Sequence, residues 1–163
     1  MTRTRKLTMR PHSRVGPGEA TTLDFLQVYR ASPMERIGMI KHGIYASDAK
    51  RMIAEFAIGQ DVVLKALNMS KANVNKKAKL DQTLSTSEGE RVIGFAKLIG
   101  RLLAIVEESG NPEGFDAASW ISHWLDSPVP ALGGVRPIEL MDTMEGQMLV
   151  STTLAQMQSG AFA

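Results

Sequence analysis

The stretch that decides the fold reads ALGGVRPIELMDTMEG and covers residues 131–146. Two adjacent glycines follow a proline-bounded turn, where glycine adopts positive φ or lets backbones approach at little cost. The proline suits the first position of a new helix, because it lacks an N–H and its φ is preset. An aspartate and a threonine then end a short apolar run and offer oxygens that cap the next helix. The stretch predicts a stiff corner between two helices, built by Gly133, Gly134, Pro137, Asp142 and Thr143.

The rest of the chain reads as further helices. Apolar residues recur at helical spacing, and Ser32 and Ser85 each begin the Ser-x-x-Glu pattern of a capping box. Ser47 and Ser70 are candidate N-caps of two more helices. The sequence therefore predicts an all-α fold, with helices at roughly 23–29, 33–42, 47–56, 60–67, 71–79, 86–109, 112–126 and 144–158.

The long helix expected after Ser85 is apolar on nearly all sides, which is typical of a helix buried on several faces. We expect it to connect two halves of the chain and to offer a surface to a second copy. Gly94 and Gly100 lower its helix propensity, so close helix–helix approach is their expected role. Trp120 and Trp124 lie four residues apart on one face, and such a pair favours the core over a binding surface.

Charge divides the chain sharply. Residues 1–106 hold 18 Lys/Arg and 9 Asp/Glu, whereas residues 107–163 hold one base, Arg136, and eight acids. The balances of +9 and −7 indicate different partners for the two ends, with nucleic acid the usual partner of a basic region. Residues 1–18 form a basic arm without periodicity, for which we expect disorder.

Two short helices joined by a tight turn, within residues 60–79, have the form of a helix-turn-helix whose second helix enters the DNA major groove. In the first helix, Val62, Val63, Ala66 and Leu67 are expected to face inward. In the second, asparagines are suited to base edges and lysines to phosphates. The alternative is a lysine face that is simply solvated. The candidate DNA-binding residues are Ser70, Lys71, Asn73, Asn75, Lys76, Lys77 and Lys79.

Several kinds of chemistry are disfavoured. The chain has no cysteine, which removes disulfides and thiolate ligands and fits a reducing cytoplasm. Its three histidines have no metal-binding spacing, and no glycine-rich phosphate loop follows a strand. The basic N-terminus has no apolar signal region after it, and no run of 18 apolar residues exists to span a membrane. We expect no metal, no cofactor and no enzymatic activity.

The sequence of this corner, residues 131–146, resembles that of the toxin-binding domain of Xre-type antitoxins, the ParS/MbcA-like partners of RES-domain toxins. The resemblance is dense over the last thirty or so residues and thinner upstream, where "L-x-M-S-x-x-x-V" looks like the family's helix-turn-helix. The residues that carry it are Ala131, Leu132, Gly133, Gly134, Pro137, Glu139, Leu140, Asp142, Thr143, Gly146, Gly160, Phe162 and Ala163.

The resemblance implies an antitoxin that neutralises a RES-domain toxin, represses its own promoter and acts as a homodimer within a larger complex. Together with the charge and helix patterns, it predicts a basic arm (1–18), an N-terminal helix-turn-helix domain (19–84), a connecting helix (85–109) and a toxin-binding domain (110–163). The alternative is a transcriptional regulator whose C-terminal domain only oligomerises or docks another protein. The implied toxin-binding residues are Arg136, Met157, Ser159, Gly160, Ala161, Phe162 and Ala163.

Overall fold

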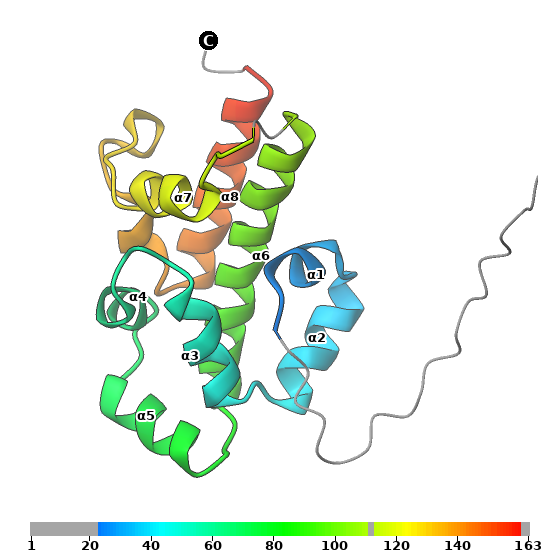
Figure 1. Ribbon diagram of the computed structural model, residues 1–163, viewed down its shortest axis with the longest axis vertical. Helices are drawn as coiled ribbons and strands as arrows, with labels where there is room; N and C mark the ends of the chain where they lie inside the picture. The colour runs from blue at the N-terminus through cyan, green and yellow to red at the C-terminus, as the bar shows by residue number, and fades with distance from the viewer. Residues whose placement is uncertain (1–22, 111–112, 161–163) are drawn as a thin grey trace, which may run out of the picture.

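Helices dominate the computed structural model, which describes residues 23–110 and 113–160 (Figure 1). Within these residues there is no strand, only an isolated bridge between Tyr45 and Thr83, so the predicted all-α fold is confirmed. The predicted basic arm lies outside the described residues. The elements are α1 (Phe25–Arg30), α2 (Pro33–His42), α3 (Ala46–Ala54), α4 (Gln60–Ala66), α5 (Lys71–Lys79), α6 (Thr86–Glu108), α7 (Ala117–Leu125), the 3-10 turns η1 (Pro130–Leu132) and η2 (Pro137–Leu140), and α8 (Met144–Gln158).

The long helix α6 is the axis of the molecule, and α1, α2, α7 and α8 all pack against it (Figure 1). Most of its apolar residues, Phe95, Leu98 and Leu102 among them, are buried by elements of the same chain, whereas Leu103, Ile105 and Val106 near its end are half-buried. The all-round apolar pattern of α6 is therefore largely explained within one molecule. Whether α6 also contacts a second copy stays a prediction.

One hydrophobic core runs through both ends of the chain. Phe56 connects its parts, since its ring meets Phe25 of α1 edge-on at a centroid distance of 5.3 Å and Phe95 of α6 at 5.7 Å. The same core continues to Ile121 of α7 and Val150 of α8. The N-terminal helices and the corner region are thus packed on the same axis.

The predicted helix starts are mostly confirmed, because capping is decided by local sequence. Ser32 and Ser85 both form complete capping boxes with the glutamates three residues on. The Ser70 hydroxyl accepts from Asn73 N–H at the start of α5. Thr143 accepts from Gly146 N–H and so caps α8.

Ser47 is not an N-cap, contrary to the prediction. Helix α3 begins at Ala46, and its cap is Tyr45, two residues before Ser47, with no side-chain cap bond. The bridge to Thr83 holds Tyr45 in an extended conformation, and its carbonyl accepts from the N–H groups of Asp48 and Ala49. A long-range contact therefore overrides the local serine signal.

The helix predicted from Pro112 begins only at Ala117, so its predicted start is wrong. Gly114 has φ 86°, a left-handed conformation that interrupts any earlier helix. Asp116 then caps α7 by accepting from Ser119 N–H. Two burial predictions also fail: Val62 is 46% exposed, and Trp120, predicted to favour the core, is 41% exposed.

Candidate functional site

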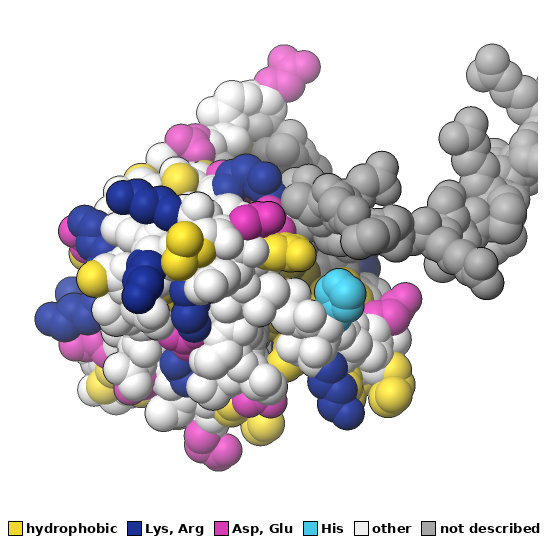
Figure 2. Space-filling view, turned by 90° about the horizontal axis from the view of Figure 1, so that it is seen from below, with side chains coloured by type: hydrophobic (Ala, Val, Ile, Leu, Met, Phe, Trp, Pro, Cys, Tyr) yellow, Lys and Arg dark blue, Asp and Glu magenta, His cyan; other side chains and the backbone are white. Residues whose placement is uncertain are grey.

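The helix-turn-helix is formed by α4 and α5. Asn68, at the turn, has φ 52°, a left-handed conformation that asparagine tolerates better than most residues. Val74 is fully buried and fixes which face of α5 points inward. Seen from the α5 end of the molecule, Lys and Arg side chains gather mainly on the side that carries α4 and α5 (Figure 2).

Four of the seven candidate DNA-binding residues project outward from α5. Asn73, Lys76 and Lys79 recur every third residue, so they share one exposed face. Lys71 is exposed as well and pairs with Asp61 of α4 at 2.7 Å. Ser70, the fifth, is exposed, but its hydroxyl is already used as the N-cap of α5.

The remaining two candidates point toward the protein. The Lys77 ammonium lies 3.0 Å from a Glu88 carboxylate oxygen at the start of α6, and both side chains are largely buried. Burial raises the pKa of Glu88, but hydrogen bonds from Ser85 and Lys77 outweigh it and hold that pKa below its ordinary value. Asn75 is half-buried, and its buried Oδ1 has no hydrogen-bond partner among the described residues. Neither side chain lies on the fully exposed face of α5 that carries Asn73, Lys76 and Lys79.

Arg91 of α6 is a positioning residue that the sequence analysis missed. Its Nε donates to the Leu67 carbonyl at 2.7 Å and its Nη2 to the Asn68 carbonyl at 3.4 Å, which satisfies the C-terminal end of α4. Arg91 thereby fixes the turn that sets α5 at its angle to α4. Only the three-dimensional contacts reveal this role, because Arg91 is 23 residues away from Asn68 in the sequence.

The corner between α7 and α8 is a tight double turn. Gly133 and Gly134 have φ values of 68° and 82°, so both need glycine's freedom at positive φ, as predicted. Hydrogen bonds from Gly134 N–H to Val129 and from Val129 N–H to Val135 close the loop. Pro137 then starts η2, also as predicted.

Arg136 braces this corner from both sides. Its guanidinium contacts Asp126, the C-cap of α7, at 3.0 Å and Glu139 of η2 at 3.1 Å. The hydrogen bond from Arg136 lowers the pKa of the exposed Glu139, which keeps that carboxylate ionised. Arg136 was predicted to bind the toxin. In this structure its guanidinium is engaged within the chain.

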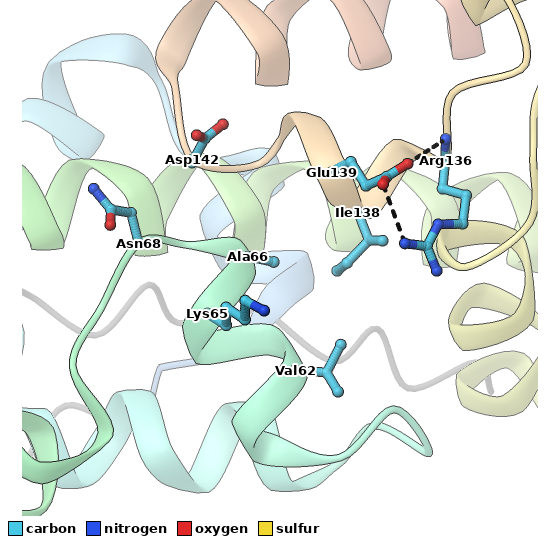
Figure 3. A pocket seen from close by; sticks show the side chains of 8 residues that line it. All are labelled: Val62, Lys65, Ala66, Asn68, Arg136, Ile138, Glu139 and Asp142. Carbon is cyan, nitrogen blue, oxygen red and sulfur yellow. Dashed lines mark hydrogen bonds and ion pairs between the residues drawn. The ribbon is translucent and has the colours of Figure 1, made fainter.

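A cleft of about 530 Å³ is lined by residues of α4 and of η2 with their flanking positions (Figure 3). Arg136, Ile138, Glu139 and Asp142 supply one wall, whereas Val62, Lys65, Ala66 and Asn68 supply the other. Both walls mix apolar and charged side chains. The helix-turn-helix and the corner motif thus share one concave surface.

The predicted C-terminal segment lies only partly within the described residues. Met157 lies exposed on the last turn of α8, and Ser159 is the C-cap residue. Gly160, with φ 74°, ends the helix as predicted. The other candidates, Ala161, Phe162 and Ala163, lie outside the described residues.

The described residues hold no cluster of three or more His, Cys, Asp or Glu side chains that could bind a metal. None of their helices is both long and apolar enough to cross a membrane. What the structure presents is two polar surfaces, one on α5 and one at the corner.

This arrangement defines a class of protein, a helix-turn-helix packed on the same axis as a second helical unit. Two family comparisons agree with it. Residues 35–97 match the antitoxin Xre-like helix-turn-helix domain, and residues 113–160 match the antitoxin Xre/MbcA/ParS C-terminal toxin-binding domain. The chain is also 60% identical, over 136 residues, to the "Prs ADP-ribosylating antitoxin" of Sphingobium sp. (strain YBL2), covering 83% of this chain and 86% of that protein.

The chain therefore belongs to the Xre/MbcA/ParS family of antitoxins. It is an antitoxin of a toxin–antitoxin system with a helix-turn-helix DNA-binding domain, and it is a binding protein and not an enzyme. The resemblance stated from the sequence is thereby confirmed. Which residues contact the toxin and the DNA stays a prediction.

Proposed function

We propose that this chain neutralises a RES-domain toxin that consumes NAD or transfers ADP-ribose from it, by occluding the toxin's active-site cleft. The observation that carries the proposal is the toxin-binding match over residues 113–160. The name of the Sphingobium relative adds ADP-ribosylation, whose ADP-ribose is drawn from NAD. A pocket for the NAD pyrophosphate is electropositive, and a C-terminal region of net charge −7 is complementary to it.

The occluding part is the C-terminal segment from Met157 to Ala163. No charged side chain follows Glu145, so the side chains of this segment enter a cleft by apolar and hydrogen-bonding contacts. The upstream acids then act at longer range, on association and orientation. Arg136 contributes by holding the corner in shape, or by exchanging its partner Asp126 for a toxin carboxylate.

Co-expression tests the proposal. The reading frame next to this chain's gene is expressed alone and with the antitoxin, while growth and cellular NAD are measured. We expect arrested growth and falling NAD with the neighbour alone, and recovery of both with the pair. A neighbour that is harmless alone, or that stays toxic beside this chain, contradicts the proposal.

We further propose that the chain represses its own promoter as a dimer, with residues 19–84 contacting DNA, residues 110–163 contacting the toxin and α6 joining them. One α5 helix covers a single half-site, and paired half-sites lie about one helical turn apart, so two copies are needed. The outward lysines of α5 support the DNA contact. Gel-shift titration against the upstream region tests it, with binding expected to weaken steeply as salt rises.

A further inference from the structure

A pair of exposed aromatic rings stands at the start of α7. Phe115, just before the helix, and Trp120, in its first half, have ring centroids 6.4 Å apart and planes tilted by 50°. They are 39% and 41% exposed, whereas Ile121 and Leu125 of the same helix are fully buried. The pair is thus outside the core, and exposed aromatic side chains of this size favour a partner surface.

Helix α7, which carries Trp120 and directly follows Phe115, has polar contacts at three points. At its start, Asp116 accepts from the Ser119 hydroxyl at 2.6 Å as well as from Ser119 N–H. In its middle, the buried Ser122 hydroxyl accepts from Ala57 N–H at 3.2 Å. Its C-cap, Asp126, is held by Arg136. Rigid aromatic anchors lose little conformational entropy on binding, so α7 is a pre-organised platform.

The charges beside the pair identify the kind of partner. Glu113 and Asp116 flank Phe115, and hydrogen bonds from Ser119 lower the pKa of Asp116, which keeps it ionised. From residue 107 to residue 125 the chain holds four acids and no Lys or Arg, and of these acids Glu107 is paired with Arg30 of α1 at 3.2 Å. Nucleic acid is repelled by such a surface, and a second copy would bring like charges together. A protein with an apolar pocket surrounded by basic residues fits.

The position of the two rings in the chain also indicates which protein binds them. Both rings lie within residues 113–160, the part that matches the toxin-binding domain. Helix α7 lies toward the end of the molecule away from α5, so a partner bound there leaves the α5 face open (Figure 1).

We infer that Phe115 and Trp120 form an aromatic anchor that inserts into an apolar, base-rimmed pocket on the toxin, apart from its active-site cleft. This inference rests on the proposed function, because it takes the toxin as the partner. It adds a second contact to the C-terminal segment: the anchor supplies affinity, whereas the segment blocks catalysis. The family description assigns toxin binding to the domain as a whole and not to these rings.

Binding measurements on the full chain test the anchor, with the purified product of the neighbouring reading frame as the probe. Phe115→Ala and Trp120→Ala should each raise the Kd by at least about 30-fold, the usual effect of truncating an aromatic hot spot. Phe115 lies outside the helix, so its removal leaves the packing of α7 intact. Met34→Ala, at a 73% exposed position on α2, is the matched control and should leave the Kd unchanged. Glu113→Lys should slow association at low salt and lose that effect at high salt.

The possible outcomes distinguish a failure of the aromatic-anchor inference from a failure of the proposed function. If wild-type protein binds and both aromatic variants bind within threefold of it, the anchor is wrong while the antitoxin role stands. If wild-type protein does not bind the probe at all, both fail together. If Trp120→Ala instead converts a dimer to a monomer in sedimentation, the rings contact a second copy and the toxin assignment is overturned. Unchanged circular dichroism and Tm are required of each variant.

Discussion

Gln147 of α8 lies directly against the Cα of Gly94 in α6. A Cβ at position 94 would overlap the Gln147 side-chain amide. That amide is buried and donates to the carbonyls of Arg91 and Met141, both at 3.0 Å. Because Arg91 also holds the turn of the helix-turn-helix, this single contact joins the corner of the C-terminal domain to the DNA-binding domain.

The change in the free energy of unfolding caused by a glycine-to-alanine substitution should therefore differ in sign between positions. Gly94→Ala displaces the Gln147 amide from two carbonyls, and we expect a net loss of about 1–2 kcal/mol despite the better helix propensity of alanine. Gly100→Ala should cost about 3 kcal/mol, since its Cβ would meet the rigid backbone of Phe25. Gly38→Ala, in open space on α2, should instead stabilise by up to about 1 kcal/mol.

Urea unfolding followed by circular dichroism measures these three free energies. Gly38→Ala serves as the control, because it changes propensity without a new contact. Equal effects at positions 38, 94 and 100 would show that helix propensity alone decides, and that the close approaches contribute nothing.

The ion pair between Lys77 and Glu88 should make stability depend on acid pH. The folded-state pKa of Glu88 lies below its unfolded value, so its contribution is present at neutral pH. As pH falls below about 4.3, the ordinary glutamate value, and through the folded pKa, the carboxylate gains a proton and the contribution is lost. The stability gap between wild type and Glu88→Gln should therefore close as pH falls through this range.

Urea midpoints measured from pH 7 to pH 3 for both proteins give that gap. Glu90→Gln, at an exposed position two residues on, is the matched control and should track wild type throughout. A gap that is constant down to pH 3 would show that the ion pair does not contribute through Glu88 ionisation.

Helix caps could be predicted from sequence because they depend on a serine or threonine and the three residues after it, as at Ser32, Ser70, Ser85 and Thr143. The exposure of Trp120 could not, since it depends on where α7 lies against α6. The role of Arg91 depends on carbonyls 23 and 24 residues away, and that of Gln147 depends in part on the Arg91 carbonyl 56 residues away. The sequence motif at residues 131–146 identified the family and through it the function. The contacts that hold this corner in place depend on tertiary packing and could not be predicted from the sequence.

Alanine substitutions of the α5 lysines should have two kinds of effect, one on DNA binding and one on stability. Lys76→Ala and Lys79→Ala remove outward charges, so each should weaken DNA binding to all sequences and reduce the salt slope by about one. Lys77→Ala leaves Glu88 without its ammonium partner, so it should lower stability more than it changes the salt slope. Fluorescence anisotropy with the upstream DNA at several salt concentrations measures the slopes. Wild-type slopes for both outward variants would mean that α5 is only a scaffold.

The two asparagines of α5 should also differ. Asn73 is exposed, and if it pairs with an adenine edge, Asn73→Ala should lose about 1–3 kcal/mol of discrimination at one base position. Asn75 has its Oδ1 buried, so Asn75→Ala should leave discrimination nearly unchanged and instead relieve an unpaired buried oxygen. Competition with single-base variants of the operator measures both. Equal loss of discrimination in the two variants would place Asn75 in the groove and contradict its position here.

Deleting residues 157–163 should abolish protection against the toxin and leave the fold intact. Leu154 is the last buried side chain among the described residues, and the side chain of Met157 is exposed. The truncated chain therefore keeps its core, and its helical signal and Tm should stay close to those of wild type. If the aromatic anchor at Phe115 and Trp120 supplies affinity, the truncated chain should still bind the toxin while failing to inhibit it. Removing only residues 161–163 as a second variant locates the inhibitory part. Full inhibition by the chain that ends at residue 156 would mean that the toxin is blocked from the α7 surface, and that the C-terminal segment has no part in it.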